Sequence, residues 1–598
     1  MASAPTVPNG STTQATHTVS VTLRVDGKDV SQNPGGLISL SIYKEFNKIP
    51  TAKIIIADGA VERGSFAKSG SQRFVPGKET DIQIGYQNET ESIFKGIIVR
   101  HSIKASSSRP SVLELECKDP SVKMALVRRS RYFSTMTDKD VFREILDGYS
   151  GKGISIGELA DTEFEHPELV QYHCTDWDFL VMRAEANGLV VVADAGEISI
   201  VKLEVGALPN HTATWGEDII DFEAEMDART HFPEVEASTW DNSNQELAQE
   251  EGSGNSGGLG GALGGLASAA SAIGSAVAAV GDALGIDLNL GIEDDKHNFP
   301  EALYGSTKQQ LFHGGDMATQ ELSAWAKGHK KRGELSQVRG RVCVRGKDFK
   351  PNETLGLQRV ASRFNGNHLI TGVMHQVHDG TWQADIQFGI STKILAQTAP
   401  DIAMPEASGL VAAIKGMHVG VVTKIGGDTQ QGNHRIKVKI PYIANQGGSN
   451  EGVWARLATL YAGNNIGFAF RPEIGDEVIL GFINDDPNDA VILGSLHSSA
   501  NAAPIPATDT NLKKVFFAKE GMQLIFDDQK KSIELKTEQG YSILMSEQDR
   551  KLEIKDSNNN SIKLSSSGIL LDSQSNLTIR AVGNVKINGA QVRINDPA

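Results

Sequence analysis

The chain has 598 residues, which is too long for one hydrophobic core and predicts three or four domains. Its formal net charge of −16 argues against a general nucleic-acid binder, because such proteins carry a basic face that displaces counterions. With 61 glycines, 20 prolines and only 6% aromatic residues, the composition favours many turns and short strands.

The first residues predict neither a secretory leader nor a fixed structure. Residues 1–16 are rich in Ser, Thr and Pro and are expected to be flexible. They lack a basic segment followed by an apolar one, so no signal peptide is predicted. The three cysteines, Cys117, Cys174 and Cys343, lie far apart and form no CxxC pair. We expect them to be buried free thiols of a protein made in a reducing cytoplasm.

Residues 17–244 predict a β-rich region with two helices. The segments HTVSVTLRVDGKDV, TDIQIGY and SVLELECKD alternate polar and apolar residues, as half-buried strands do. One helix is expected in TDKDVFREILDGYS, with Thr137 or Asp138 as its N-cap. A second helix is expected in DWDFLVMRAEANG, with an N-cap at Asp176 and Gly188 at its C-terminal end.

Two distant segments resemble each other and predict one β-barrel module used twice. The segment VPGKETDIQIGYQNETESIFKGIIVRHSI resembles KPNETLGLQRVASRFNGNHLITGVMHQV. The spacing from Thr80 to His101 equals the spacing from Thr354 to His375. The second barrel is assigned to residues 300–400. Chance similarity between two pairs of alternating strands is the alternative.

Residues 245–299 form a Gly/Ala-rich insert between the two barrels. Its length would permit a membrane span, but small residues dominate it and its flanks are acidic. Its larger side chains follow heptad spacing, with Ala270 filling the one gap. These are Leu259, Leu263, Leu266, Ile273, Val277, Val280 and Leu284. Three interpretations remain open: a mobile loop, a self-associating helix that plugs an axis or contacts cargo, and a membrane-active segment.

The last third of the chain predicts two further domains joined by linkers at 401–416 and 499–511. Residues 417–498 carry five strand patterns in a short length, which suits a five-stranded OB-type barrel. Residues 512–598 carry pairs of aliphatic residues two apart, each pair followed by a turn. These pairs are Leu524/Phe526, Ile533/Leu535, Ile543/Met545, Leu552/Ile554, Ile562/Leu564, Ile569/Leu571, Leu577/Ile579, Val585/Ile587 and Val592/Ile594. Because the segment has few large apolar residues, its core is thin. A lone copy of this segment would therefore be hard to stabilise.

Catalytic motifs are not found. The sequence has no P-loop, HExxH, GxSxG or CxxC, and its glycine-rich stretches lack the context that phosphate binding needs. His375 and His378 lie three apart on an expected strand, where they point to opposite faces and cannot share one ion. We therefore predict no enzyme activity, cofactor or metal site, although a metal on the axis of the last domain stays open.

Several motifs in order resemble the VgrG spikes of type VI secretion systems and the related hub and spike of contractile phage tails. VQYHCTDWDFLVMRAEANGLVV resembles the hub motif, and FNGNHLITGVMHQVHDGTWQADIQFG is similar to the second hub barrel. VWARLATLYAGNNIGFAFRPEIGDEVILGFINDDPNDAVILGSLH resembles the spike OB domain. The resemblance covers about residues 17–500 and the C-terminal segment, but not the insert.

The resemblance implies a mainly β fold with minor α: two hub barrels with helices, an OB barrel and a C-terminal intertwined triple-stranded β-helix. It implies a homotrimer in which two barrels per chain make a pseudo-sixfold ring on a hexameric inner-tube protein. Implied partners are baseplate proteins, effector cargo and a PAAR-type tip protein. The tip protein would contact Val592, Ile594, Asn595, Asp596, Pro597 and Ala598.

The implied function is a non-enzymatic spike that is assembled in the cytoplasm without a signal peptide, is expelled on contraction and pierces the target membrane mechanically. Two alternatives are an envelope-degrading spike that bears an enzyme and a glycan-binding tailspike. The gaps around residue 500 hold no catalytic domain, and the last domain has no Trp for a sugar groove. Whether the machine is a type VI system, an extracellular particle or a phage stays open.

Overall fold

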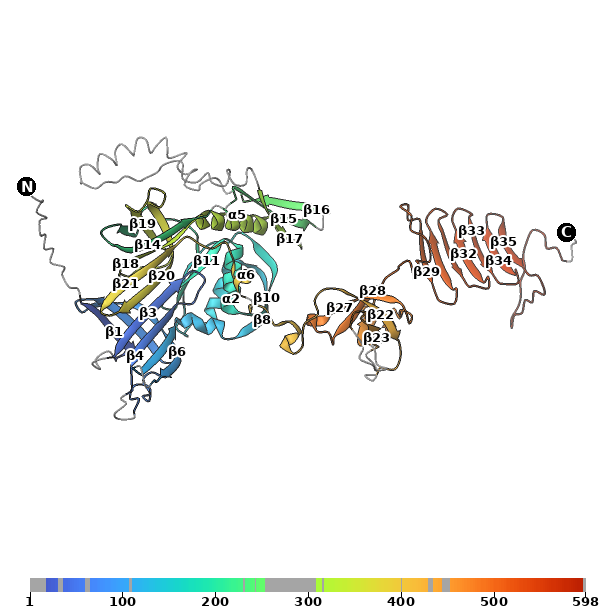
Figure 1. Cartoon of the computed structure of the whole chain (residues 1–598). Coiled ribbons are helices and arrows are strands. Elements are labelled where there is room, and N and C mark those ends of the chain that lie inside the picture. The colour runs from blue at the N-terminus through green and yellow to red at the C-terminus, as the bar shows by residue number, and fades with distance from the viewer. Residues whose placement is uncertain are drawn as a thin grey trace, which may run out of the picture. The chain divides into compact units, whose positions relative to one another are not determined.

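The computed structural model describes residues 18–30, 36–59, 65–106, 110–227, 229, 232–241, 244–252, 308–314, 317–399, 401–428, 434–443 and 452–594. The chain forms two compact units, residues 1–404 and 405–598 (Figure 1). Both units are built mainly from strands, with few helices, which confirms the predicted fold class.

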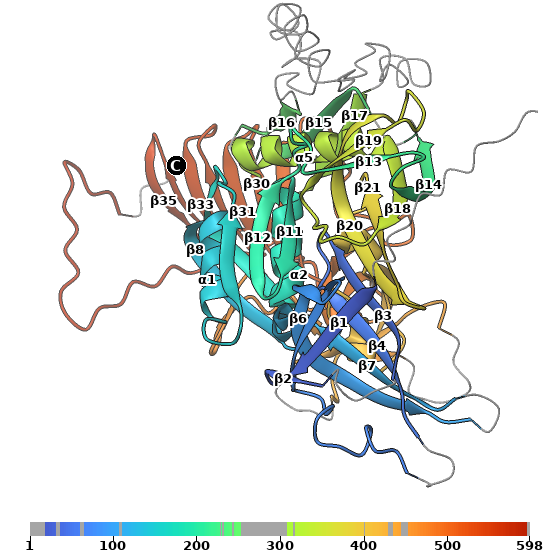
Figure 2. The same cartoon turned by 90° about the vertical axis from the view of Figure 1, so that its left-hand side faces the viewer.

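The first unit is organised by one large sheet that contains both hub barrels. Its N-terminal half contains β1 (Val19–Val25), β2 (Lys28–Asp29), β3 (Leu37–Glu45), β4 (Thr51–Ala57), β5 (Glu79–Tyr86), β6 (Glu89–Lys104) and β7 (Val112–Lys118). Its second half contains β13 (His211–Thr214), β14 (Ile219–Met226), β18 (Val338–Arg345), β19 (Thr354–Gln358), β20 (Gly366–His378) and β21 (Thr381–Phe388). Each half surrounds its own hydrophobic core, and β3 and β20 pair to join them (Figure 2).

The two halves repeat the same strand order. The run β3-β4-β7-β6-β5 in the first half corresponds to β14-β18-β21-β20-β19 in the second. Two β-bulges coincide: the bulge after Ile98 on β6 matches the one after Ile370 on β20, and the bulge after Leu37 on β3 matches the one after Ile219 on β14. This register makes His101 equivalent to Val373, so the sequence match of His101 with His375 was wrong by two residues. Alternating strands look alike in shifted registers, and the bulge that fixes the register leaves no mark in their pattern.

A helical layer lies between the two halves in sequence. It contains the short 3-10 helix η2 (Pro120–Ala125), α1 (Asp138–Asp147), α2 (Asp176–Ala186) and the strands β8 (Arg128–Thr137), β9 (Ser155–Leu159), β10 (Glu165–Thr175), β11 (Leu189–Asp194) and β12 (Glu197–Lys202). Thr137 caps α1, which confirms one of the two predicted caps. The cap of α2 is Thr175 and not Asp176, because the Thr175 side chain accepts the N–H of Asp178. Asp176 lies buried in the first turn and accepts hydrogen bonds from Arg131, Gln171 and Tyr149.

A second helix layer was not predicted from the sequence. Helix α5 (Thr319–Ser336) covers a small sheet of β15 (Glu234–Asp241), β16 (Glu246–Glu251) and β17 (Lys308–His313). It crosses the end of α2 so closely that a Cβ added at Gly328 would lie 2.5 Å from the Cα of Gly188. Arg183 of α2 donates to Glu321 of α5 and to Asp138 of α1, which ties the three helices together.

The second unit begins with the short 3-10 helix η4 (Glu406–Gly409), after α6 (Leu395–Thr398) has closed the first unit. Five strands then form a closed barrel: β22 (His418–Lys424), β23 (Ile436–Lys439), β24 (Val453–Leu457), β27 (Glu477–Phe482) and β28 (Ala490–Ser495). This confirms the predicted five-stranded barrel. A loop hairpin of β25 (Ala462–Gly463) and β26 (Ile466–Gly467) and the turn η5 (Ile483–Asp485) complete it.

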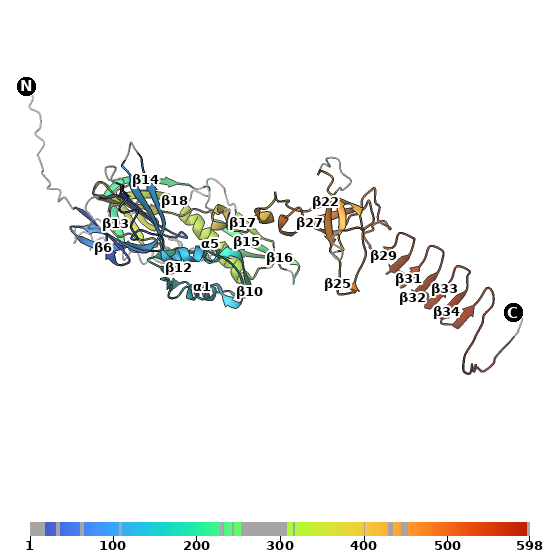
Figure 3. The ribbon, with the colours of Figure 1, turned by 90° about the horizontal axis from the view of Figure 1, so that it is seen from below.

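The rest of the second unit is an antiparallel sheet in which each strand pairs with the next along the chain (Figure 3). We call it the needle sheet. It contains β29 (Lys513–Phe517), β30 (Gln523–Asp527), β31 (Ser532–Lys536), β32 (Ser542–Ser546), β33 (Lys551–Lys555), β34 (Ser561–Ser565) and β35 (Gly568–Asp572). The expected winding of three chains around each other concerns contacts that one chain cannot make, and it stays a prediction.

Candidate functional site: the needle sheet and its surroundings

One face of the needle sheet is almost entirely apolar. The aliphatic pairs predicted from the sequence stand opposite one another on neighbouring strands and form two ladders across the sheet. One ladder contains Leu524, Leu535, Ile543, Ile554, Ile562 and Leu571, and the other contains Phe526, Ile533, Met545, Leu552, Leu564 and Ile569. Most of these twelve side chains are exposed in the single chain. We call this surface the apolar face.

The opposite face of the needle sheet is largely polar. Its central column contains Glu534, Glu553 and Lys563 together with three apolar residues, Ile525, Leu544 and Leu570. Lys551 donates to Glu553 over 3.0 Å within β33. A sheet with one solvated and one apolar face is the pattern of an element that buries its apolar face against another layer. No other described part of this chain covers the apolar face of β31 to β34.

The last three aliphatic pairs do not form strands. After β35 the chain continues to residue 594 without further strands among the described residues, whereas the sequence predicted strands there. Leu577, Ile579, Val585 and Ile587 are exposed. A strand needs a neighbour for its backbone hydrogen bonds, and this stretch has no strand partner among the residues that the structure describes.

The expected tip residues are only partly described. Val592 and Ile594 are exposed, and 82% of the Ile594 surface is accessible. Asn595, Asp596, Pro597 and Ala598 lie outside the described residues. Contact with a tip protein therefore stays a prediction.

The base of the needle sheet is attached to the barrel by aromatic and ionic contacts. Phe470 of the barrel stacks on Phe516 of β29, with ring centroids 5.9 Å apart. Glu473 pairs with Lys519 over 3.4 Å nearby. These contacts fix the barrel and the first needle strand to each other across the linker at residues 499–511.

The heptad residues of the insert lie outside the described residues, from Leu259 through Leu263, Leu266, Ile273, Val277 and Val280 to Leu284. The strands on either side of the insert are described. Glu246–Glu251, which the sequence assigned to the start of the insert, form β16. β16 and β17 flank β15, where Lys308 Nζ lies 2.6 Å from Glu251 and 3.1 Å from Glu236. The two ends of the insert therefore lie at the same end of this small sheet, one on each of its two outer strands.

The two histidines of β20 point to opposite faces, as their spacing predicted. His375 is fully buried beside Trp382, and neither ring nitrogen makes a hydrogen bond of normal geometry. Burial lowers the pKa of His375 to about 3, helped by the charge of Lys44. His378 is exposed and pairs with Asp379 over 2.8 Å. Among the described residues, no three His, Cys, Asp or Glu side chains are grouped as metal ligands would be.

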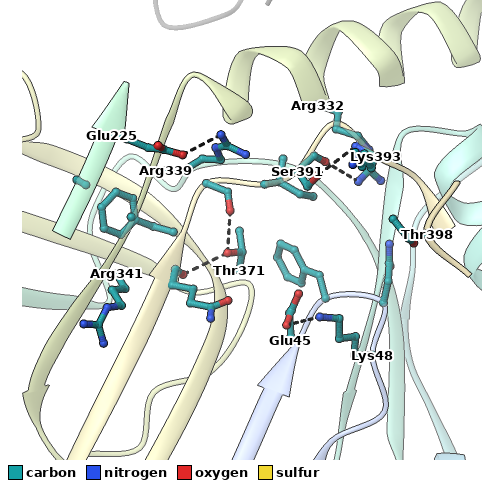
Figure 4. A pocket seen from close by; sticks show the side chains of 18 of the residues that line it. Glu45, Lys48, Glu225, Arg332, Arg339, Arg341, Thr371, Ser391, Lys393 and Thr398 are labelled. Atoms are coloured by element: carbon teal, nitrogen blue, oxygen red, sulfur yellow. Dashed lines mark hydrogen bonds and ion pairs between the residues drawn. The ribbon is translucent and has the colours of Figure 1, made fainter. Parts of the chain in front are cut away.

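A cavity of about 700 Å³ lies in the first unit beside β14, β18 and β21 (Figure 4). Most of its charged side chains are engaged within the chain. Glu225 pairs with Arg339 over 2.8 Å, Glu45 with Lys48 over 2.8 Å, and Arg332 with Glu185 over 3.3 Å. These pairs leave no set of convergent free charges among the labelled residues that would define a small-molecule site.

The three cysteines are free and buried, as predicted. Burial raises the pKa of the Cys117 thiol to about 12, so this thiol is unreactive at neutral pH. None of the helices in the described ranges combines the length and the apolar composition that crossing a bilayer requires.

Comparison with protein families identifies both units. The model of the Alg8 N-terminal domain matches residues 15–280 and 298–379, which is more than half of the chain. The model of the type VI secretion system/phage-baseplate injector OB domain matches residues 418–497, which hold the closed barrel.

Curated relatives match shorter segments. The spike protein VgrG5 of Pseudomonas aeruginosa is 28% identical over 106 residues, which cover 17% of this chain and 13% of VgrG5. The actin cross-linking toxin VgrG1 of Vibrio cholerae is 32% identical over 101 residues, which cover 16% of this chain and 9% of the toxin. The matches thus span only a small part of these relatives.

Among solved structures, a 43 kDa tail protein of prophage MuSo2 from Shewanella oneidensis is 11% identical with a TM-score of 0.42, covering 62% of this chain and 98% of the tail protein. The five strands of the closed barrel lie within the residues that the injector OB domain model matches. The chain therefore belongs to the Alg8 N-terminal domain family and is a VgrG-like spike protein of the contractile injection and phage-tail family.

Proposed function

We propose that this spike protein works as a homotrimer that docks on the inner tube of a contractile injection machine, pierces the target envelope and carries a tip protein or cargo. The observation that carries the proposal is the apolar face of the needle sheet. Burying a side chain of this size stabilises an assembly by about 1.5–3 kcal/mol, and twelve of them per chain give a large driving force.

Three copies suit this surface better than two. Two sheets stacked face to face would cover both apolar faces but leave every outer strand edge open. Three sheets around one axis can pool their apolar faces in a prism, and the unpaired stretch 573–594 can then find strand partners on neighbouring chains. A narrow prism without open edges is stiff, which suits an element that transmits force along its length.

The duplicated hub supports docking on a tube. Two equivalent barrels per chain give six similar units in a trimer, which matches a hexameric ring of inner-tube proteins. The closed barrel and the needle sheet occur once per chain, so they keep threefold symmetry. The hub would thus connect an inner tube of sixfold symmetry to a closed barrel and needle sheet of threefold symmetry.

We infer that the chain itself is not an enzyme and that toxic activity, where present, belongs to cargo. The matched actin cross-linking toxin shares 9% of its length with this chain, so its activity does not transfer with that match. Purified trimer should hydrolyse neither peptidoglycan, lipid nor nucleic acid. Turnover that survives repurification and is abolished by one point substitution would refute this part of the proposal.

The function is tested in cells that produce the whole particle. Particles built with a chain lacking residues 512–598 should contract without delivering cargo, and wild-type chain supplied from a plasmid should restore delivery. A truncated chain that still supports full delivery would contradict the role of the needle sheet in piercing.

The tip is tested separately with Ile594→Asp. A charge on this exposed residue should abolish co-purification of the tip protein, because a charge in an apolar contact is costly to desolvate. The trimer should remain intact, since Ile594 lies beyond the needle strands. Unchanged capture of the tip protein would show that the last residues are not its platform.

A further inference from the structure

A pair of strands joins the two hub barrels of one chain. The two strands equivalent to this pair have free edges in the single chain. Within the chain, β20 pairs with β21 on one side and, over Gly372–His378, with β3 on the other. The equivalent of β20 is β6, and the equivalent of β3 is β14. Among the described residues, β6 has no partner beside Arg100–Lys104 other than β7, and β14 pairs only with β18.

We propose that β6 of one chain pairs with β14 of the next chain, in the same register as the internal pair of β20 and β3. The proposal rests on the homotrimer proposed above and names the contact that closes its ring. Each chain has one free β6 edge and one free β14 edge among its described residues, so the contact runs head to tail, and in the proposed trimer three such contacts close the ring.

The register follows from the β-bulges that the two halves share. The bulge after Ile98 matches the bulge after Ile370, which makes Arg100 equivalent to Gly372. The bulge after Leu37 matches the bulge after Ile219, which makes Glu45 equivalent to Asp227. Because Gly372 stands opposite Glu45, Arg100 should stand opposite Asp227 of the next chain.

The remaining pairs follow along the strands. His375 stands opposite Ile42 in the internal contact, and both are fully buried. Their equivalents are Ile103 and Ala224. Ile103 is 46% exposed in the single chain, although its equivalent is a core position. An aliphatic side chain exposed at this position is accounted for if the next chain covers it.

Charge is complementary in this register. Arg100 stands opposite Asp227, and Lys104 stands opposite Glu223, so both basic residues of this edge meet acidic ones. Opposite charges facing each other across strands are favourable, and like charges are not. In the single chain Arg100 lies 3.8 Å from Glu116 and Glu223 lies 3.5 Å from Arg341, so these two have only long contacts to exchange. Lys104 pairs closely with Glu114 and Asp227 with Arg229, so in the trimer these two share their charge between an internal partner and the next chain.

Disulfide cross-linking of the full-length chain tests the register. Ile103→Cys combined with Ala224→Cys should give, on mild oxidation, a covalent species of three chains on a denaturing gel. The matched control combines Ile103→Cys with Ile220→Cys. Ile220 is exposed on the same strand but lies about 13 Å further along at ~3.3 Å per residue, so it should give little cross-linked product.

The outcomes separate this proposal from the proposed function. A trimer by native mass that forms no disulfide at the 103/224 pair, or forms it equally with the control pair, would overturn the register while leaving the trimer in place. A single-chain mass would overturn the trimer itself.

Exchanging the charges of two facing residues gives a second test of the register that does not depend on cysteine geometry. In the cross-linking background, Lys104→Glu should lower the yield of the three-chain species several-fold, because it places two acids opposite each other. Adding Glu223→Lys should restore the yield. Failure of the second substitution to restore it would contradict the pairing of these two residues.

Discussion

At the scale of single residues, His375 carries a specific electrostatic cost. Both of its ring nitrogens are buried without a normal hydrogen bond, and the charged groups that act on it are Lys44 and Asp194. A buried polar atom without a partner costs about 1–3 kcal/mol. Replacing this side chain by an apolar one of similar size should therefore not destabilise the hub at neutral pH.

We predict a pH effect with a definite sign. The pKa of His375 is about 3 in the folded chain and about 6.5 when unfolded, so between these values only the unfolded state binds the proton. The free energy of unfolding should therefore fall as the pH drops below about 6.5. Urea denaturation between pH 7 and pH 5 should show a shallower fall for His375→Leu than for the wild type.

The exposed His378 provides the control for this experiment. His378→Leu makes the same replacement at an exposed position of the same strand and leaves the buried His375 in place, so it should keep the steeper fall. Equal slopes for His375→Leu and the wild type would contradict the assignment of the acid sensitivity to His375.

Single residues also mark a limit of sequence reasoning. Asp176 follows the usual preference for an N-cap, yet Thr175 has that role, since Asp176 is held by Arg131, Gln171 and Tyr149. When two adjacent residues can each cap a helix, their tertiary contacts decide which of them does so. The local sequence does not reveal these contacts.

At the scale of elements, the strands were easier to predict than helix α5. Its N-cap, Ala318, makes no side-chain hydrogen bond, and the helix contains glycines at 328 and 333. Its only large aliphatic buried side chain is Leu322, so it shows little apolar periodicity. The needle strands, in contrast, repeat an aliphatic pair and a turn, and their cross-strand register followed from that repeat.

The close crossing of α2 and α5 gives an element-scale prediction. Gly328→Ala should lower the melting temperature of the first unit, because the added Cβ would meet the backbone of Gly188 at 2.5 Å. Such overpacking costs about 1–3 kcal/mol. Gly314→Ala is the control, since a Cβ at Gly314 meets nothing within 4 Å. Equal melting temperatures for both variants would contradict this packing.

The apolar face of the needle sheet gives a second prediction at the scale of elements. Leu535→Asp should break the trimer or make it dissociate on dilution, because it places a charge among side chains that the trimer buries. Lys536→Asp introduces the same residue one position later on the polar face of the same strand and should leave the trimer intact. Light scattering compares the two, and loss of the trimer in both, or in neither, would contradict the assignment of the faces.

At the scale of the whole molecule, the sequence suggested a second barrel in residues 300–400, but β13 and β14, which lie within residues 17–244, pair with β19 and β18 of that second half. The sequence could not predict that β3 and β20 join the two barrels into one sheet, because strand pairing between residues more than 300 apart leaves no local pattern. The proposed contacts between chains depend on this joint, since it defines which strand edges are used and which remain free.

Removing the needle sheet tests how assembly is shared between the two units. A chain ending at residue 511 keeps the hub edges but loses the apolar ladders, so we expect a trimer only at high concentration and single chains on dilution. Sedimentation across a concentration series measures this. A truncated chain that stays trimeric when dilute would show that the hub alone supplies the assembly energy.

The native mass of the full-length chain tests the central claim most directly. One chain has a mass of 64.2 kDa. Native mass spectrometry or mass photometry at nanomolar concentration should find one dominant species of three times this mass. A dominant species of one or two chains under the same conditions would contradict the proposed trimeric spike.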